Sequence, residues 1–345
     1  MQRWKVIRPS WLPFSYRVKV RVPLMLLLLL VAICAALVIT ISVGEYIIPP
    51  QAVLETLLGN GSQSYSFIVL TLRLPRVLVA LLVGMAMAAS GAILQGLTRN
   101  PLASPDIIGI SNGASLTAVA LLTLFSAAPI SLLPLVAFGG ACAAAILIYL
   151  LAWNGGSSPT RLILVGVGLS AVASSLVQIL IANSQVIVVN QALIWLAGSV
   201  YGRTWEHFWS LLPWLVIFLP LALVMTRHLD ALHLGDDLAR SLGSQVERQR
   251  IILLIASVAL AGSSVAIAGT IGFVGLMAPH IARMLVGPSH GGLLPVATLV
   301  GGLLVILADL IGRTIFAPIE IPCGVITAAV GAPYFIWLLI RSRNL

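Results

Sequence analysis

The feature that most constrains this chain is a series of long apolar segments that carry almost no charge. The first, residues 23–44, is longer than the roughly 20 residues that an α-helix needs to cross a bilayer. A secretory signal has an apolar stretch of about 7–15 residues and then a small-residue cleavage site, and neither fits here. Only 8% of the residues are charged, against about 25% in a soluble domain. We therefore expect an all-α integral membrane protein.

The apolar segments predict about ten transmembrane helices. They form one domain over residues 23–345, after a basic N-terminal segment at residues 1–22. The eighth is short and contains Pro279, which predicts a helix that does not cross the bilayer cleanly. The ten ranges are 23–44, 75–97, 107–127, 131–153, 161–182, 206–227, 251–270, 273–286, 293–312 and 322–341.

Glycines recur at a spacing that brings small residues onto one helix face. Examples are Gly109 with Gly113 and Gly166 with Ser170. In lipid this spacing lets helix backbones approach closely. Glycine is also simply common in membrane helices, so each single pair stays ambiguous.

The positions of lysine and arginine predict the orientation, because these residues gather on the cytoplasmic side of a membrane protein. Six of the 19 precede the first span, and with ten crossings fifteen fall on the side of the N-terminus. The other four are Arg73, Arg76, Arg203 and Arg313. We therefore expect a multi-pass protein of the bacterial cytoplasmic membrane with both termini in the cytoplasm. The net charge of +9 follows from this topology, and we expect no nucleic-acid partner.

The sequence lacks the patterns that catalysis would need. Lys5 and Lys19 are its only lysines, so it has no G-x-x-x-x-G-K-[ST] phosphate loop, and any ATP must bind another polypeptide. H-E-x-x-H does not occur, and Cys34, Cys142 and Cys323 lack metal-ligand spacing. G-x-S-x-G occurs at residues 109–113 and 287–291, but without the preceding strand that a nucleophile elbow needs. We expect a protein that is not an enzyme and that binds neither a metal nor a cofactor itself.

The ten acidic residues bear on the kind of transport. None lies near the centre of a predicted span, although Asp309 falls in the last turn of one. A charge at the bilayer centre costs at least about 2.5–3.5 kcal/mol and normally marks an ion or proton path. The pattern therefore disfavours an ion-coupled secondary carrier that works alone.

The most polar stretch between two spans lies at about residues 229–249. Gly235 permits a sharp turn, and Asp236 and Asp237 suit the first turn of a short helix, where carboxylates meet free N–H groups. Leu238 and Leu242 would lie one turn apart on one face, before Gly243 ends that helix. The stretch predicts two short helices with an apolar stripe that docks another protein. An ordinary solvated loop is the alternative.

Five long motifs in this order are similar to those of one transporter family. The chain resembles the permease subunits of the iron-siderophore and vitamin B12 class of ABC importers, the FecCD type, and within it the permeases for ferric citrate and related siderophores. The motifs are "LRLPRVLVALLVGMAMAASGAILQGLTRNPLASPDIIGISNGA" (72–114), "WLAGSVYGRTW" (195–205), "LGDDLARSLG" (234–243), "GTIGFVGLMAPHIAR" (269–283) and "ADLIGRTIFAPIEIPCGVITAAVGAPYFIWLL" (308–339).

The resemblance implies a type II ABC importer permease of ten helices with short cytoplasmic coupling helices. Its implied partners are a second permease subunit, two ATPase subunits that bind ATP and Mg²⁺, and an extracytoplasmic siderophore-binding protein. A paralogue is favoured over an identical copy as the second permease. The implied ATPase-coupling residues are Gly235, Asp236, Asp237, Leu238, Arg240, Leu242 and Gly243.

Two further sets of residues take roles from the same resemblance. Arg73, Arg76 and Arg313 match outward-facing basic positions that pair with carboxylates of the binding protein. Asn100 and Leu102 match positions near the cytoplasmic gate of the pathway. The expected function is translocation of a ferric siderophore, with a cobalamin or haem importer of the same family as the alternative. The basic N-terminal extension departs from the family pattern and would lie on an anionic membrane surface.

Overall fold

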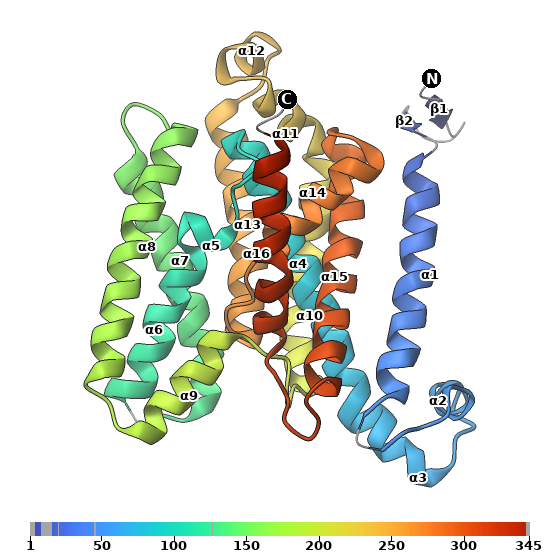
Figure 1. The fold of residues 1–345 in the computed structure, drawn as a ribbon. Helices are drawn as coiled ribbons and strands as arrows, with labels where there is room; N and C mark the ends of the chain where they lie inside the picture. Colours follow the sequence, from blue (N-terminus) through green and yellow to red (C-terminus); the bar gives the residue numbers. More distant parts are fainter. Residues whose placement is uncertain (1–3, 8–15, 20, 45, 126, 343–345) are drawn as a thin grey trace.

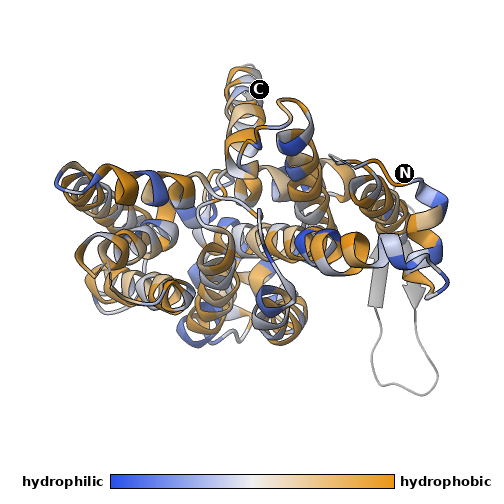
Figure 2. Cartoon of the chain, turned by 90° about the horizontal axis from the view of Figure 1, so that it is seen from below, coloured by the Kyte–Doolittle hydropathy of each residue, from blue (hydrophilic) through white to orange (hydrophobic). Residues whose placement is uncertain are grey.

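The computed structural model describes residues 4–7, 16–19, 21–44, 46–125 and 127–342. It is a bundle of helices whose long members run roughly parallel to one another (Figure 1). Seven helical segments are long and apolar enough to cross a membrane. Seen along the bundle, hydrophobic residues predominate in the helices (Figure 2). The expected all-α membrane fold is confirmed for the part of the chain from residue 21 onward.

The elements follow one another with short connections. In the N-terminal segment, β1 (Trp4–Ile7) pairs antiparallel with β2 (Tyr16–Lys19). A π-helix (Phe67–Arg73) leads directly into α4, and a 3₁₀ turn (Ile130–Leu132) leads into α7. The α-helices are α1 (Arg21–Ser42), α2 (Pro50–Leu57), α3 (Gln63–Ser66), α4 (Leu74–Thr98), α5 (Pro105–Ile108), α6 (Ile110–Leu124), α7 (Leu133–Ala152), α8 (Pro159–Ala182), α9 (Val186–Ala197), α10 (Trp205–Val224), α11 (Thr226–His233), α12 (Asp236–Ser241), α13 (Val246–Ala268), α14 (Val274–Val286), α15 (His290–Thr314) and α16 (Cys323–Ser342).

The ten predicted spans all fall on helices, and one of them differs clearly from the expected length. The predicted span at 107–127 is broken at Gly109, whose φ of 99° separates α5 from a 15-residue α6. The predicted eighth span is the 13-residue α14, which is short as expected, and the tenth is the 20-residue α16. The apolar helix α9 was not predicted, because its 12 residues are too few to register as a span.

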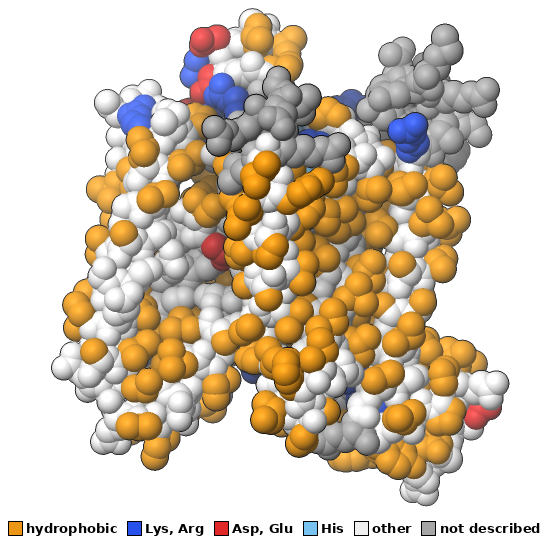
Figure 3. Space-filling view, viewed as in Figure 1, with side chains coloured by type: hydrophobic (Ala, Val, Ile, Leu, Met, Phe, Trp, Pro, Cys, Tyr) orange, Lys and Arg blue, Asp and Glu red, His pale blue; other side chains and the backbone are white. Residues whose placement is uncertain are grey.

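The bundle has two ends with different characters. One end carries α11 and α12, and we call it the α12 end; the opposite end carries α2, α3 and α9, and we call it the α9 end (Figure 1). Hydrophobic side chains cover the sides of the bundle, and most of the visible charged ones lie toward the ends (Figure 3).

The core is organised around α4, which packs against α13, α14 and α15. Glycines allow the closest approaches. A methyl group on Gly84 would overlap the carbonyl oxygen of Gly301 in α15, and one on Gly91 would overlap the carbonyl oxygen of Gly275 in α14. Close backbone contact of this kind is how helices associate in lipid.

Two of the small-residue pairs noted in the sequence face each other. A methyl group on Gly109 would lie 2.9 Å from the hydroxyl of Ser170 and 3.2 Å from the carbonyl oxygen of Gly166. The break between α5 and α6 therefore packs directly on α8. Glycine is required at residue 109 both by this contact and by its positive φ.

We predict that Gly91→Ala destabilises the fold, because the added methyl group forces α4 away from α14. Overpacking of this kind costs about 1–3 kcal/mol. Thermal unfolding of the purified protein in detergent measures it. Gly139→Ala in α7 is the matched control, because no atom lies within 4 Å of its added methyl group. The control should be neutral or stabilising, since alanine is the better helix former. Equal midpoints for the two variants would contradict this account of α4 packing.

Candidate functional site

The connection between α10 and α13 begins with α11, which is fixed to the body of the bundle. Leu229 and Leu232 are buried, and Leu229 lies against Gly96 of α4. Asp230 accepts hydrogen bonds from the backbone N–H of His290 (2.9 Å) and from its Nδ1 (2.6 Å). Burial alone would raise the pKa of Asp230, but hydrogen bonds from His290 and Ser289 outweigh it, so the pKa lies below its usual range.

The connection then turns sharply into α12, as the sequence predicts. Gly235 has a φ of 120°, a conformation that side chains rarely adopt, and α12 begins at Asp236. The helix ends after Ser241, and Gly243 follows with a φ of 81°. The prediction of two short helices separated by a glycine turn is confirmed.

An apolar surface projects from α12 at the tip of the α12 end. Leu234, Leu238 and Leu242 are 61%, 57% and 68% exposed, and we call these three residues the leucine surface. Asp237 beside them is fully exposed and pairs with Arg240 at 3.1 Å. Large apolar side chains gathered on an exposed tip outside the apolar sides of the bundle are typical of a protein-binding surface.

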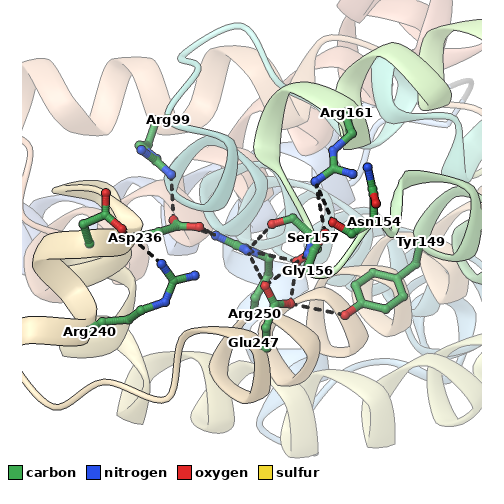
Figure 4. Close-up of polar contacts among 11 residues, drawn as sticks. Arg99, Tyr149, Asn154, Gly156, Ser157, Arg161, Asp236, Arg240, Glu247 and Arg250 are labelled. Carbon is green, nitrogen blue, oxygen red and sulfur yellow. Dashed lines mark hydrogen bonds and ion pairs between the residues drawn. The ribbon is translucent and has the colours of Figure 1, made fainter.

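Asp236 plays a different part, because its side chain points into the bundle. Its carboxylate is 21% exposed and accepts hydrogen bonds from two arginines of different helices (Figure 4). Arg99, at the end of α4, donates from Nη2 at 2.7 Å. Arg250, in the first turns of α13, donates from its Nη2 at 2.8 and 2.9 Å to the two carboxylate oxygens. The start of α12 is therefore tied to α4 and α13.

Arg250 is the most deeply buried charge in this region, with 1% of its side chain exposed. Its Nη1 donates to the carbonyl oxygen of Ser157 (2.6 Å), to the Ser157 hydroxyl (2.9 Å) and to Glu247 (3.2 Å). A buried charge is tolerated only when it is well paired and hydrogen-bonded. The guanidinium thus joins α12 to the loop between α7 and α8.

Glu247 binds both Arg250 and the α7–α8 loop. It accepts hydrogen bonds from the backbone N–H of Ser157 (3.1 Å), from the Ser157 hydroxyl (2.7 Å) and from the hydroxyl of Tyr149 (3.4 Å) (Figure 4). We call the five residues that hold α12 in place the anchor network: Arg99, Ser157, Asp236, Glu247 and Arg250.

A polar cleft of about 710 Å³ lies between α12 and the α7–α8 loop. Residues 154–161 and the start of α12 line it, together with Arg99 and Glu247, so four of the five anchor-network residues border the cleft. Arg161 donates across the loop to the carbonyl oxygen of Gly156 at 3.2 Å.

The predicted gate residues lie next to the anchor network. Asn100 and Leu102 follow α4 in one tight turn, in which the Leu102 N–H donates to the Asn100 side chain at 2.9 Å. Arg99, which ends α4 with a φ of 54°, connects this turn to Asp236. Their role at a gate stays a prediction, although the turn is now physically linked to α12.

The three arginines predicted to face outward lie together at the α9 end. Arg76 pairs with Asp309 (2.8 Å) and with Glu320 (2.9 Å). Arg73 donates to the carbonyl oxygens of residues 41 and 46, and buried Arg313 donates to that of residue 40. All three guanidinium groups thus have partners within the chain, and their role in docking a binding protein stays a prediction.

Asp106 lies in a different setting from the one that the sequence suggests. Predicted to precede a span, it lines a cavity of about 590 Å³ inside the bundle, where it accepts a hydrogen bond from Ser111 at 2.6 Å. Ser115, Asn112 and Gln178 line the same cavity. An acidic side chain is visible in the hollow between α8 and α16 (Figure 3). An ionisable group at this depth normally marks a functional site.

Sequence reasoning missed the anchor network except for Asp236. The available signal was the pair Glu247 and Arg250, three residues apart at the start of an apolar helix, where charge would normally face water. The partner Ser157 carries no sequence signal, because its contribution depends on how the α7–α8 loop folds back. Within the described residues, no group of three or more histidine, cysteine or acidic side chains could hold a metal ion.

Comparison with known proteins gives consistent matches over nearly the whole chain. The profile of the FecCD transport family matches residues 25–341. A probable siderophore transport system permease protein of Bacillus subtilis is 48% identical, covering 90% of this chain and 92% of its own. An Fe(3+)-citrate import system permease protein of the same organism is 47% identical, covering 88% and 90%. A solved structure described as an inward-facing conformation of a metal-chelate type ABC transporter is similar with a TM-score of 0.84 at 31% identity, covering 92% and 99%.

We predict that Arg250→Ala destabilises the protein by about 2–3 kcal/mol. Breaking a buried pair usually costs about 3–5 kcal/mol, and the loss is smaller here because Asp236 keeps Arg99 and some exposure to water. Thermal unfolding in detergent and the rate of proteolysis in the α7–α8 loop measure the effect. Arg240→Ala is the control, since its pair with Asp237 is exposed and contributes little. Equal stability of the two variants would refute the anchoring role of Arg250.

Proposed function

The chain belongs to the FecCD transport family, and from this premise we propose that it is the membrane-spanning permease subunit of an ATP-driven importer for a ferric siderophore. The relatives named above are permeases of siderophore and ferric citrate systems, which supports an iron chelate such as ferric citrate or a hydroxamate complex as cargo. A cobalamin or haem importer of the same family is the alternative.

The single observation that carries the proposal is the leucine surface on a rigidly held α12. The sequence has no phosphate loop, so ATP and Mg²⁺ would bind to a separate ATPase. Leu234, Leu238 and Leu242 project at the tip of the α12 end, where a groove of that ATPase could receive them. This surface favours the docking interpretation over an ordinary solvated loop, because the anchor network fixes the orientation of α12.

The anchor network supplies a route from the ATPase to the transport path. Movement of α12 would pull on Asp236, which holds Arg99 at the end of α4 and Arg250 in α13. Arg250 in turn holds the α7–α8 loop through Ser157. When one side chain of a buried hydrogen-bonded network is displaced, the side chains bonded to it must move with it, or their hydrogen bonds break. Closure of the ATPase dimer would therefore shift the ends of α4, α7 and α8 together.

The proposed orientation puts the α12 end in the cytoplasm. The arginines described at that end include Arg99, Arg161, Arg240, Arg248 and Arg250, which agrees with the positive-inside pattern. The siderophore-binding protein would then dock at the α9 end. A second permease subunit, a paralogue rather than an identical copy, would complete the path.

The hollow that contains Asp106 is the part of the chain that we assign to the wall of this path. Its polar side chains offer hydrogen bonds to a hydrophilic chelate inside an otherwise apolar bundle. An ion-coupled secondary carrier could also use a buried acid, so Asp106 weakens the sequence argument against that alternative. The dependence of uptake on ATP separates the two functions.

We predict that proteoliposomes holding this chain with its copurified subunits and binding protein take up ferric chelate only with ATP. Ferric citrate and a ferric hydroxamate are the two cargoes to compare. Leu238→Ser combined with Leu242→Ser should abolish ATPase copurification and uptake while leaving thermal stability unchanged. The loss exceeds tenfold in affinity, since burying each leucine contributes about 1.5–3 kcal/mol.

The control for that experiment is Ser241→Ala, which changes an exposed residue of the same helix outside both the leucine surface and the implied coupling residues. It should retain the ATPase. Uptake driven by an ion gradient in vesicles without any ATPase would overturn the importer, and full ATPase retention by the double leucine variant would overturn the docking surface.

We predict that Arg73→Glu weakens binding of the siderophore-binding protein, and that the difference from wild type shrinks as salt rises. Arg73 is paired only with carbonyl oxygens, so its charge is not neutralised, unlike that of Arg76. Attraction between exposed charges is screened at high ionic strength. Arg248→Glu, an equal change of charge at the α12 end, serves as the control. Equal affinities of Arg73→Glu and wild type at low salt would exclude this docking role.

A further inference from the structure

A cation without a carboxylate partner lies at the α9 end. Arg203 precedes α10 and lines a cavity of about 820 Å³ between α7, α9, α10 and α13. Within the described residues no acidic side chain forms an ion pair with it, and its buried Nε has no hydrogen-bond partner. Glu206 also lines the cavity, but the structure places no hydrogen bond between it and Arg203. A partly buried guanidinium in this state favours an anion in the cavity.

His207 adds a second donor at the same place. The backbone N–H of Thr204 donates to Nδ1 of His207 at 3.2 Å, so the proton of the neutral ring is on Nε2. That Nε2 lies 3.4 Å from Nη1 of Arg203, and two N–H donors cannot satisfy each other. Both groups are therefore free to donate to a common acceptor. The resulting geometry suits a phosphate, whose several oxygens can accept from an arginine fork and a neighbouring ring.

The rest of this cavity is apolar and continues along the bundle. Leu133, Phe138, Trp195 and Trp214 line it beyond the Arg203 end. Phe138 and Trp214, whose ring centroids lie 4.6 Å apart, also line a second and almost wholly apolar cavity of about 520 Å³. The two cavities share these rings in their linings, and we call the larger one, of about 820 Å³ between α7, α9, α10 and α13, the groove.

The groove lies on a side of the bundle that carries exposed apolar side chains. Leu135 of α7, Ile194 of α9 and Trp209 of α10 are all exposed around it. Side chains of this kind on the long flank of a spanning helix face hydrocarbon. The groove is therefore open to lipid along its length and has two N–H donors at its end.

We propose that this groove is a binding site for an anionic phospholipid, with the phosphate on Arg203 and His207 and an acyl chain along Phe138 and Trp214. A free phosphate or a carboxylate would satisfy the donors but leave the apolar groove empty. A neutral lipid would fill the groove but bring no net charge to Arg203. The lipid belongs to the outer leaflet, a placement that rests on the orientation proposed above. The binding site itself depends on neither that orientation nor the transport function.

The test is lipid retention by the full chain, measured by native mass spectrometry after delipidation in detergent. Dioleoyl phosphatidylglycerol should bind more tightly than dioleoyl phosphatidylcholine, and glycerol 3-phosphate, which has no acyl chain, should not compete. Arg203→Ala should lower phosphatidylglycerol retention about tenfold or more, the loss expected for a charged hydrogen-bond partner. Arg203→Lys should keep an intermediate retention, because it keeps the charge but not the fork.

Two further variants separate this site from general effects. Ala266→Phe adds a ring to the cavity lining while keeping Arg203, and it should also lose phosphatidylglycerol. Arg248→Ala removes an exposed charge far from the groove and should bind as wild type does. Equal retention of the two lipids by wild type, or unchanged retention by Arg203→Ala and Ala266→Phe, would overturn the proposal. Full competition by glycerol 3-phosphate would reduce the site to one for a free anion and equally overturn it.

Discussion

Close backbone contact at glycines is the constraint on which the rest of this structure depends. Helices in lipid gain little from burying apolar side chains, because the surrounding acyl chains are equally apolar, so they must associate through van der Waals packing. Gly84 and Gly91 let α4 touch α15 and α14 along its length. Because α4 is held so tightly, Arg76 and Arg99 occupy fixed positions at opposite ends of the bundle. A displacement of α4 at one end of the bundle can therefore shift the residues at the other end.

A single buried guanidinium gives the α12 end its order. Arg250 lies where water cannot compensate its charge, so each of its bonds to Asp236, Ser157 and Glu247 resists being broken. The leucine surface needs this rigidity, since a freely moving loop would lose conformational entropy on binding and transmit little force. Polar groups thus set the geometry here, while apolar groups provide the surface that a partner would contact.

Much of the fold follows from the sequence because its signals are local. Apolar length gives the long helices, and Gly235 with Asp236 gives the turn into α12. The anchor network could not be predicted, because Ser157 and Arg250 are 93 positions apart and meet only when the α7–α8 loop folds back. Asp106 was misplaced for a related reason: the break at Gly109 lets a polar turn enter the bundle, which hydropathy alone does not reveal. The expected partner subunits and the expected ferric siderophore rest on the resemblance to a family, because no pattern of residues in this sequence predicts them.

The exposed leucines on α12 have a consequence for the life of the protein in the cell. In the proposed orientation, a newly inserted chain that has not yet bound the proposed ATPase would present Leu234, Leu238 and Leu242 to water. Such a patch is what chaperones and quality-control proteases recognise, and it also invites aggregation. Copies of the chain in excess of the proposed ATPase would therefore be degraded. The amount of permease in the membrane would then depend on the amount of ATPase available to cover the leucine surface. The same three side chains would thereby keep the number of permease subunits matched to the number of ATPase subunits.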